Sequence, residues 1–438
     1  MDVTVITDIL SRKNVNEYYN LYRKTQWYDK EKMRQYQLLK LRKLIAHCYS
    51  NVPYYREYMD SCKIKVDDIS SIADIRLFPV LTKEIIKDNY EKFIPLNLKY
   101  IKGVKVSQTG GTTGNILFKR NDANTRSSIW ATYKRFRNDW MGVKDRDRSL
   151  LLMGGHVLKH SFKDEVKKRI VEILSNAISF NPYDTSEINY LHIRERLKKD
   201  DFVLLKSYSQ FLYSLAVRLK SENLSFNIKA ITTTAEPLTQ EHRDLFEEVF
   251  HAEVYDQYGC GEIGGIAYEC PCHEGLHISE ERVIAEINDK SELILTDLDN
   301  YAMPFIRYWN ADEVIVSSKP CSCGRKSLLL KKIQGRTCDY IIGVNGEILH
   351  WAYFWHLFFD SMIAEKRNLI KFQIVQTDTS EILLRIVANE FTEEEKLMLI
   401  SDIHQRLGNI SVKFSFEKDI ENSASGKYRP VVNKLLIK

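Results

Sequence analysis

The first hundred residues alternate apolar and charged side chains with the period of an α-helix. Between residue 16 and about residue 60, aromatic and aliphatic residues recur every three or four positions, and charged residues lie between them. A Val-Pro-Tyr-Tyr turn at 52–55 interrupts this pattern. The spacing predicts a helical entry segment within residues 1–100.

From about residue 100 to 300, short apolar runs alternate with amphipathic stretches. SLLLMGG (149–155), FVLLKSY (202–208) and IKAITTTAE (228–236) have the length and the aliphatic or β-branched composition of buried strands. Stretches with helical period follow them, such as QFLYSLAVRLKSE (210–222) and QEHRDLFEEVF (240–250). Strand, loop and helix repeated in this order predict α/β layers with a largely parallel sheet.

After about residue 340 the pattern changes again. IKFQIVQTD (370–378) and EILLRIVAN (381–389) are predicted antiparallel strands, FTEEEKLMLISDIHQRLG (391–408) a helix, and ISVKFSFEK (410–418) a further strand. They predict a small α+β domain of roughly 100 residues. The aromatic stretch WAYFWHLFFD (351–360) is interpreted as a helix that packs on this domain rather than as a ligand site.

Composition narrows the class of protein. The chain has 438 residues, 44% of them apolar, and 64 Lys and Arg against 59 Asp and Glu give a net charge of +5. Acidic and basic residues are interleaved, so nucleic-acid binding has no compositional support. No basic and apolar leader opens the chain and no run of eighteen apolar residues occurs, which predicts a cytoplasmic protein without a membrane span.

The glycine-rich segment SQTGGTTGN (107–115) is too poor in side-chain bulk to build a core. Its glycines would let backbone N–H groups approach a phosphate closely, and its hydroxyls add donors. A Walker-type loop is disfavoured because Asn115 stands after the last glycine, where that motif has lysine. The alternative is a Gly-rich hairpin turn whose Thr side chains bond to its own backbone.

Four later segments carry polar groups in loops. YDQYGCGE (255–262) presents Tyr258, Gly259 and Glu262, and PFIRYWNAD (304–312) ends in Asp312. GRTCDY (335–340) lies where the composition changes, and SASGKYR (423–429) presents Lys427 beside a glycine. Each segment alone is a weak signal, and each of these side chains could be an ordinary solvated charge. Their order and spacing together are specific.

With these motifs in this order, the chain resembles the adenylate-forming enzymes. It is most similar to the phenylacetate–CoA ligase-like branch, which includes proteins associated with capsular polysaccharide synthesis. The resemblance extends to NVPYY (51–55) and FPVLTKE (78–84) in the entry segment. It implies an α/β fold with a large adenylation domain (1–335), a hinge (336–339) and a small mobile α+β cap (340–438) that carries the catalytic lysine.

The resemblance also implies roles for individual residues. Lys427 corresponds to the mobile catalytic lysine, and Glu262 to the carboxylate that binds Mg²⁺. The expected nucleotide-binding residues are Ser107, Thr109, Gly110, Gly111, Thr112, Thr113, Gly114, Glu236, Tyr258, Gly259, Asp312 and Arg336. Three positions depart from the family pattern: Asn115 replaces a basic residue, Gly261 a threonine and Cys338 an acidic residue.

The implied reaction uses ATP and Mg²⁺ to convert a carboxylic acid into an acyl-adenylate with release of pyrophosphate. The acyl group then passes to a thiol, that of CoA or of a carrier protein. Two alternatives remain open: transfer to an amine such as an amino sugar, and a non-catalytic nucleotide-binding relative. Segments 153–156, 208–209 and 232–235 are expected either to border the acid or to be framework loops.

Two cysteine-rich segments, ECPCHEGLH (269–277) and PCSCGR (320–325), suggest a metal. Cys270, His277, Cys321 and Cys323 offer three thiolates and an imidazole, the ligand set of a closed tetrahedral zinc site. Cys272 and His273 are competing ligands, and reduced surface thiols are the alternative without metal. The resemblance adds support, because members of the branch have a comparable pattern. Such a structural zinc would tie together two loops beside the active site.

Overall fold

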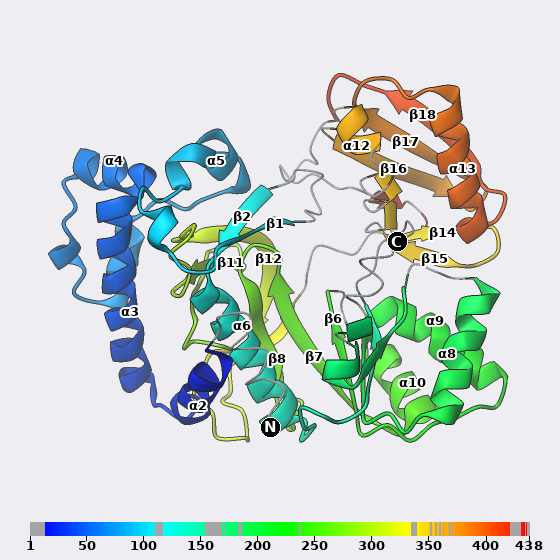
Figure 1. The fold of residues 1–438 in the computed structure, drawn as a ribbon, viewed down its shortest axis with the longest axis horizontal. Coiled ribbons are helices and arrows are strands. Elements are labelled where there is room, and N and C mark those ends of the chain that lie inside the picture. The colour runs from blue at the N-terminus through cyan, green and yellow to red at the C-terminus, as the bar shows by residue number, and fades with distance from the viewer. Residues whose placement is uncertain are drawn as a thin grey trace.

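In the computed structural model, the described residues are 14–109, 117–153, 169–170, 172–182, 186–235, 238–333, 340–350, 353–354, 357–358, 361, 363–367, 369, 371–420, 431–433 and 435. Figure 1 shows the entry helices (blue) on one side of a central sheet, further helices (green) on the other, and the C-terminal strands and helices above the latter. The predicted fold class, a large layered α/β part followed by a small α+β part, is confirmed.

The entry segment is helical, as its spacing predicts. It contains α2 (Val15–Thr25), α3 (Lys30–Asn51) and α4 (Pro53–Cys62), followed by the short helix α5 (Lys83–Asp88). Asp29 caps α3 by accepting a hydrogen bond from the Lys32 amide, and Pro53 opens α4, where its missing N–H costs nothing. The buried faces of α3 and α4 share one core with the antiparallel part of the central sheet.

The central sheet has eleven strands and two halves. One half is parallel, in the order β4 (Ala177–Ser179), β3 (Ser149–Leu152), β5 (Leu204–Tyr208), β6 (Ala230–Thr234) and β7 (Glu253–Cys260). The sheet continues antiparallel through β8 (Gly264–Glu269), β9 (Leu276–Ile278), β13 (Leu329–Ile333), β12 (Tyr308–Val316), β11 (Glu292–Asp297) and β10 (Val283–Ile287). The prediction of a largely parallel sheet is therefore right for the first half only.

Alternating side chains on the parallel strands face two helical layers. Leu205, Ile231 and Val254 pack with α8 (Glu187–Lys199), α9 (Ser209–Ser221) and α10 (Gln240–Phe250). The other face, with Leu204 and Tyr255, packs against α6 (Ala123–Arg135) and the π-helix η5 (Phe136–Trp140). The strand period of two thus assigns each strand residue to one layer.

The C-terminal part has its own core. β16 (Lys371–Asp378) and β17 (Glu381–Val387) pair antiparallel as predicted, β18 (Ser411–Phe416) and β19 (Val431–Asn433) flank them in parallel, and α13 (Glu393–Leu407) follows β17 in the chain. A separate hairpin contains β14 (Tyr340–Ile342) and β15 (Ile348–His350), and α12 (Ile363–Lys366) is a single turn. Described aromatics of the 351–360 stretch, including Phe354 and Phe358, are buried in this core, which confirms the packing interpretation.

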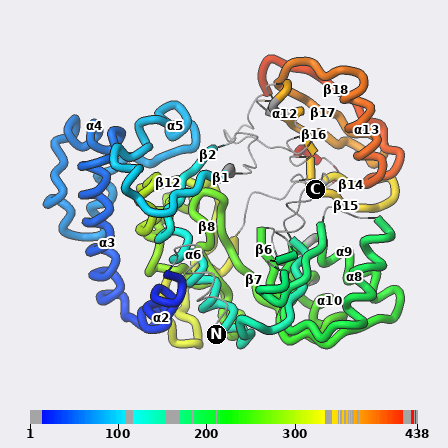
Figure 2. Tube along the Cα trace, viewed as in Figure 1, coloured from blue at the N-terminus to red at the C-terminus, as the bar shows by residue number. Residues whose placement is uncertain are grey.

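The C-terminal core contacts the central sheet at one identified point. Tyr208, the last residue of β5, is partly buried and packs against that core. Figure 2 follows the chain from the entry helices to this C-terminal part, beside which the C-terminus lies. The C-terminal part thus meets the carboxyl end of a parallel strand, the end at which open α/β sheets bind ligands.

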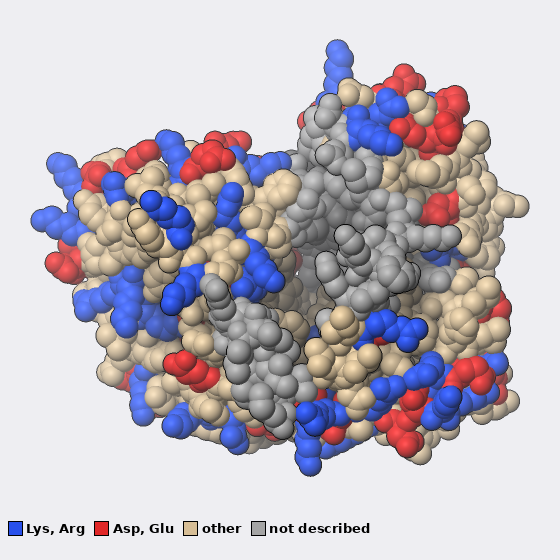
Figure 3. All heavy atoms as spheres, viewed as in Figure 1, with Lys and Arg blue, Asp and Glu red and all other residues tan. Residues whose placement is uncertain are grey.

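The surface agrees with the interleaved charges of the sequence. On the face shown in Figure 3, basic and acidic side chains are interspersed over the described parts. Among the described residues, no helix combines the length and the apolar character that a bilayer span requires.

Candidate functional site

The segment expected to bind phosphate joins two paired strands. β1 (Lys105–Thr109) runs antiparallel to β2 (Leu117–Asn121), with Thr109 opposite Leu117 and Ser107 opposite Lys119. The intervening residues Gly110, Gly111, Thr112, Thr113 and Gly114 lie outside the described residues. A hairpin is therefore present, as the structural alternative requires, and the phosphate-binding role stays a prediction.

Two lysines converge on Glu262, in the turn between β7 and β8. Lys83, the first residue of α5, places its Nζ 3.0 Å from Glu262 Oε1, and both side chains are nearly buried. Lys119 on β2 donates from its Nζ to the Glu262 carbonyl oxygen at 3.2 Å. The hairpin, the entry segment and the sheet thus meet at one residue, Glu262.

The electrostatic balance keeps this carboxylate ionised. Burial raises the pKa of Glu262, but the ion pair and hydrogen bond with Lys83 outweigh burial, and the pKa lies below its usual range. Burial also lowers the pKa of Lys119, which is 6% exposed. The two ammonium groups suit a polyphosphate, whereas a metal ion would have to replace Lys83 on the Glu262 carboxylate.

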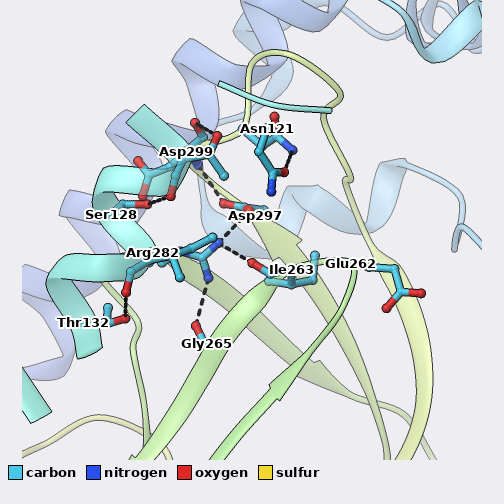
Figure 4. Close-up of polar contacts among 12 residues, drawn as sticks. Asn121, Ser128, Thr132, Glu262, Ile263, Gly265, Arg282, Asp297 and Asp299 are labelled. Atoms are coloured by element: carbon cyan, nitrogen blue, oxygen red, sulfur yellow. Dashed lines mark hydrogen bonds and ion pairs between the residues drawn. The ribbon is translucent and has the colours of Figure 1, made fainter. Parts of the chain in front are cut away.

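Arg282 holds the turn that carries Glu262. Its guanidinium is completely buried, pairs with Asp297 Oδ2 at 2.7 Å, and donates to the carbonyl oxygens of Ile263 at 2.6 Å and Gly265 at 3.0 Å. Figure 4 shows these contacts and shows the Glu262 side chain directed away from Arg282. Arg282 therefore fixes the backbone of the turn without neutralising its carboxylate.

Gly259 is required by the same turn for steric reasons. A Cβ at this position would lie 2.5 Å from the carbonyl oxygen of Gly264 on β8. Gly264 itself has φ of +94°, which side chains rarely adopt. The two glycines let β7 and β8 approach closely beside Glu262, so Gly259 has a packing reason independent of any nucleotide.

Tyr258 and Asp312 also lie together. The Tyr258 hydroxyl donates to Asp312 Oδ2 at 2.5 Å, and Asn310 Nδ2 donates to the same oxygen at 2.9 Å. Burial, followed by the charge of Asp312, raises the pKa of Tyr258 far above its usual range, so the phenol stays neutral. The structure brings these two predicted residues within contact, and their roles in binding adenine and ribose stay predictions.

Other predicted site residues cannot be placed. Glu236, Arg336 and Lys427 lie outside the described residues, as does the predicted hinge at 336–339. Lys83, in contrast, was missed as a site residue, although it lies in the quoted FPVLTKE segment. The sequence signal that could have pointed to Lys83 was its position directly after Thr82, the residue that caps α5.

The cysteine cluster forms as predicted from the ligand types. Candidate ligand atoms of Cys270, His277, Cys321 and Cys323 all lie within 4.8 Å of one another. Cys270 Sγ is 3.5 Å from Cys321 Sγ, and Cys323 Sγ is 3.4 Å from His277 Nε2. Two thiolates on one tetrahedral zinc would be about 3.8 Å apart. The four residues therefore fit a zinc ion.

The surroundings also suit a metal. Burial lowers the pKa of His277 to about 4, so the imidazole is neutral, as a ligand must be. Its other nitrogen, Nδ1, lies 3.1 Å from Ser327 Oγ, a contact that orients the ring. Cys272 is exposed, and His273 Nδ1 contacts Glu269 at 3.3 Å, so neither belongs to the group.

The cluster lies away from Glu262, not beside it. Glu262 precedes β8 and Cys270 follows it, and a six-residue strand spans about 20 Å. The expectation that the metal joins loops beside the active site is therefore wrong. The cluster instead joins the β8–β9 connection and β9 to the loop that precedes β13.

The chain is similar to curated ligases over most of its length. It is 24% identical to the phenylacetate-coenzyme A ligase of Thermus thermophilus, over 72% of this chain and 73% of the relative, and 27% identical to that of Pseudomonas putida over similar shares. Protein CapK of Staphylococcus aureus is 25% identical over 88% of this chain and 86% of CapK. Residues 343–434 match the family model of the CapK C-terminal domain. The resemblance predicted from the motifs is confirmed.

Solved structures agree on the fold. The 2-hydroxyisobutyryl-CoA ligase complex with 2-HIB-AMP and CoA has a TM-score of 0.62 at 16% identity, covering 93% of this chain and 91% of the ligase. The same ligase in its postadenylation state gives 0.59 over 94% and 92%. At this identity the likeness establishes the fold alone.

We expect Arg282→Met to lower the free energy of unfolding by about 3 to 5 kcal/mol, because Asp297 would stay buried without its partner. Urea unfolding at pH 7 measures the loss. The control is Lys220→Met, which removes an exposed ion pair with Glu248 and should cost less than about 1 kcal/mol. Equal losses in the two variants would show that the buried pair does not stabilise the turn.

For the cysteine cluster, we expect purified protein to contain about one zinc ion per chain, as four ligands imply. Cys321→Ser should lower both the zinc content and the melting temperature, measured by elemental analysis and calorimetry. Cys272→Ser, which changes an exposed neighbour outside the group, should leave both unchanged. Protein that is free of metal yet equally stable would refute the zinc assignment.

Proposed function

We propose, from the premise that the chain is a relative of the phenylacetate–CoA ligases and of CapK, that it is an AMP-forming carboxylate ligase. It would use ATP to activate a carboxylic acid as an acyl-adenylate and then transfer the acyl group to a thiol. The observation that carries the proposal is the ionised, buried Glu262 with the ammonium groups of Lys83 and Lys119 around it.

This arrangement supports phosphate chemistry for an electrostatic reason. A carboxylate that attacks the α-phosphorus of ATP meets a centre already surrounded by negative charge, so charge neutralisation must supply much of the acceleration. Mg²⁺, held by Glu262, would neutralise the phosphates. Lys119 and Lys83 would contribute cations on the side of the β1–β2 hairpin and of the entry segment.

In the first half-reaction, an oxygen of the acid forms a bond to the α-phosphorus while the bond to the pyrophosphate oxygen breaks. Pyrophosphate leaves with that electron pair. Tyr258 and Asp312 would hold the nucleoside, together with Arg336, while Lys427 would bridge the acid and the α-phosphate. The Ser107–Gly114 segment and Glu236 would complete the nucleotide site. In the second half-reaction, a thiol attacks the acyl carbon and AMP leaves.

The acceptor is proposed to be the thiol of CoA. The support is that the curated ligases and the solved 2-hydroxyisobutyryl-CoA ligase carry CoA in their names. The cap (340–438), rotating about 336–339, would admit this second substrate after adenylation. The zinc ion would be structural, because all four of its positions are taken by protein ligands. A cytoplasmic location would give the enzyme access to ATP and CoA.

We expect Glu262→Gln to lower acid-dependent exchange between pyrophosphate and ATP at least about 100-fold, because it removes the negative charge that holds the metal. Exchange is measured over a panel of carboxylic acids with Mg²⁺. Glu247→Gln, on the exposed face of α10, is the matched control and should be fully active. Wild-type exchange in Glu262→Gln would exclude its assigned role.

Lys427→Ala should slow acyl-adenylate formation about a hundredfold or more, as loss of a transition-state charge partner worth roughly 3 kcal/mol predicts. ATP binding should stay nearly intact, whereas Thr112→Val or Gly111→Val should impair binding itself. Thiol transfer from a chemically prepared acyl-adenylate should survive, because the cap has then moved the lysine away. Lys418→Ala, exposed in the same part of the chain, is the control. Equal defects in both half-reactions would contradict a cap that alternates between two positions.

A further inference from the structure

Three polar side chains lie on one face of the parallel strands, near their carboxyl ends. Lys206 on β5 is directly opposite Thr232 on β6, and Gln257 on β7 is opposite Thr234. Because registered residues of parallel neighbours share a face and neighbouring strands are about 4.8 Å apart, these groups form one polar strip. Two residues earlier on β5 and β6, the same face is apolar, and Leu204 and Ala230 are buried there.

The groups of this strip lack protein partners. Among the described residues, the Lys206 ammonium makes no ion pair or hydrogen bond and contacts only the Tyr133 ring, 4.0 Å from its centroid. Thr232 Oγ1 and Gln257 Oε1 are buried without a hydrogen-bond partner. Buried polar atoms are normally paired, so the Lys206 ammonium and the Thr232 hydroxyl, which can both donate, indicate an anionic ligand, whereas Gln257 Oε1 is an acceptor that such a ligand would leave unpaired.

Charge points the same way. Burial lowers the pKa of Lys206 to about 7, and the positive charge of Arg137 on η5 acts in the same direction. The other titratable group against it, Tyr133 on α6, has a pKa raised by burial and is neutral. Below about pH 7, Lys206 is therefore a cation that forms no ion pair with a described acidic residue.

The strip lies where the acid would lie. Lys206 is two residues before Tyr208, which contacts the C-terminal core, and Gln257 directly precedes Tyr258, which contacts Asp312. As a residue, Lys206 is only partly buried. The strip thus shares the face of Tyr208, which contacts the C-terminal core, and lies at the end of β7 that carries Tyr258, whose side chain alternates to the other face.

We propose that Lys206 is a specificity-determining residue that binds a second carboxylate of the substrate, so that the acid is a dicarboxylic acid. This inference rests on the proposed function. One carboxylate would be activated near the nucleotide, while the other pairs with the Lys206 ammonium and accepts a hydrogen bond from Thr232. Tyr133 would shield the pair from water.

The test compares acids that differ only in the second charge. Straight-chain dicarboxylic acids of four to ten carbons and benzene dicarboxylic acids are assayed by pyrophosphate–ATP exchange, each beside its monomethyl ester. We expect a dicarboxylic acid to exceed its monoester at least 30-fold in kcat/KM. Lys206→Met should remove this preference, mainly through KM, and Thr232→Val should weaken it. Lys199→Met, exposed at the end of α8, should retain it.

A pH profile separates charge recognition from a packing role. The cationic lysine binds the anion, so KM for the dicarboxylic acid should rise as the pH rises above about 7, while KM for the monoester stays flat. Lys206→Met should abolish this difference. Equal loss of activity with a dicarboxylic acid and its monoester in Lys206→Met, or exchange supported only by the monoesters, would overturn the inference and leave the ligase function standing. If none of the acids supports exchange between pyrophosphate and ATP, both the ligase function and this inference are overturned.

Discussion

The buried guanidinium of Arg282 is the constraint on which the rest of the site depends. A cation without access to water needs partners, and here Asp297 and two carbonyl oxygens pair with its two terminal nitrogens, while Nε has no partner. Those carbonyls belong to Ile263 and Gly265, so the groups that satisfy the cation also define the path of the β7–β8 turn. The conformation that presents Glu262 is therefore determined inside the core, not at the surface.

This turn lies at the junction of the two halves of the sheet. On one side the strands run parallel and end together near Tyr208 and Thr234, and on the other side they run antiparallel and bring Asp312 on β12 into reach of Tyr258. The antiparallel half also packs on α3 and α4, and the connected entry segment supplies Lys83. Residues separated by up to 179 positions meet at one site because the sheet joins both halves without interruption.

The sequence predicted what depends on local pattern. The period of the entry segment, the strands and helix of the C-terminal part, and the aromatic packing around Phe354 and Phe358 all follow from side-chain spacing. The grouping of the four candidate ligands was also predictable, since three cysteines and a histidine occur in two short segments. Tyr258 and Asp312 were identified by motif. Their contact follows once both strands are placed in the same sheet.

Long-range pairing was not predictable in the same way. Arg282 lies in ISEERVIAE, where three consecutive charged residues suggest a solvated strand edge rather than a buried cation. The ion pair between Lys83 and Glu262 joins positions that are 179 residues apart, and no local pattern of side chains predicts it. The antiparallel half was missed because β13 pairs with β9 and β12, an order that the chain does not follow.

That strand order has a consequence for how the molecule folds. β13 lies between β9 and β12, with Leu329 opposite His277 and Leu330 opposite Leu276. The edge of β9 therefore stays unpaired until β13, which comes later in the chain, has been added to the sheet. Closing the loop between β9 and β13 costs conformational entropy before any strand pairing offsets that cost. The four ligands of the cysteine cluster join the same two segments, and a bound metal would hold them together while β13 is inserted. The supply of metal during synthesis would then govern the yield of folded chain, even if the finished protein never uses the metal in its chemistry.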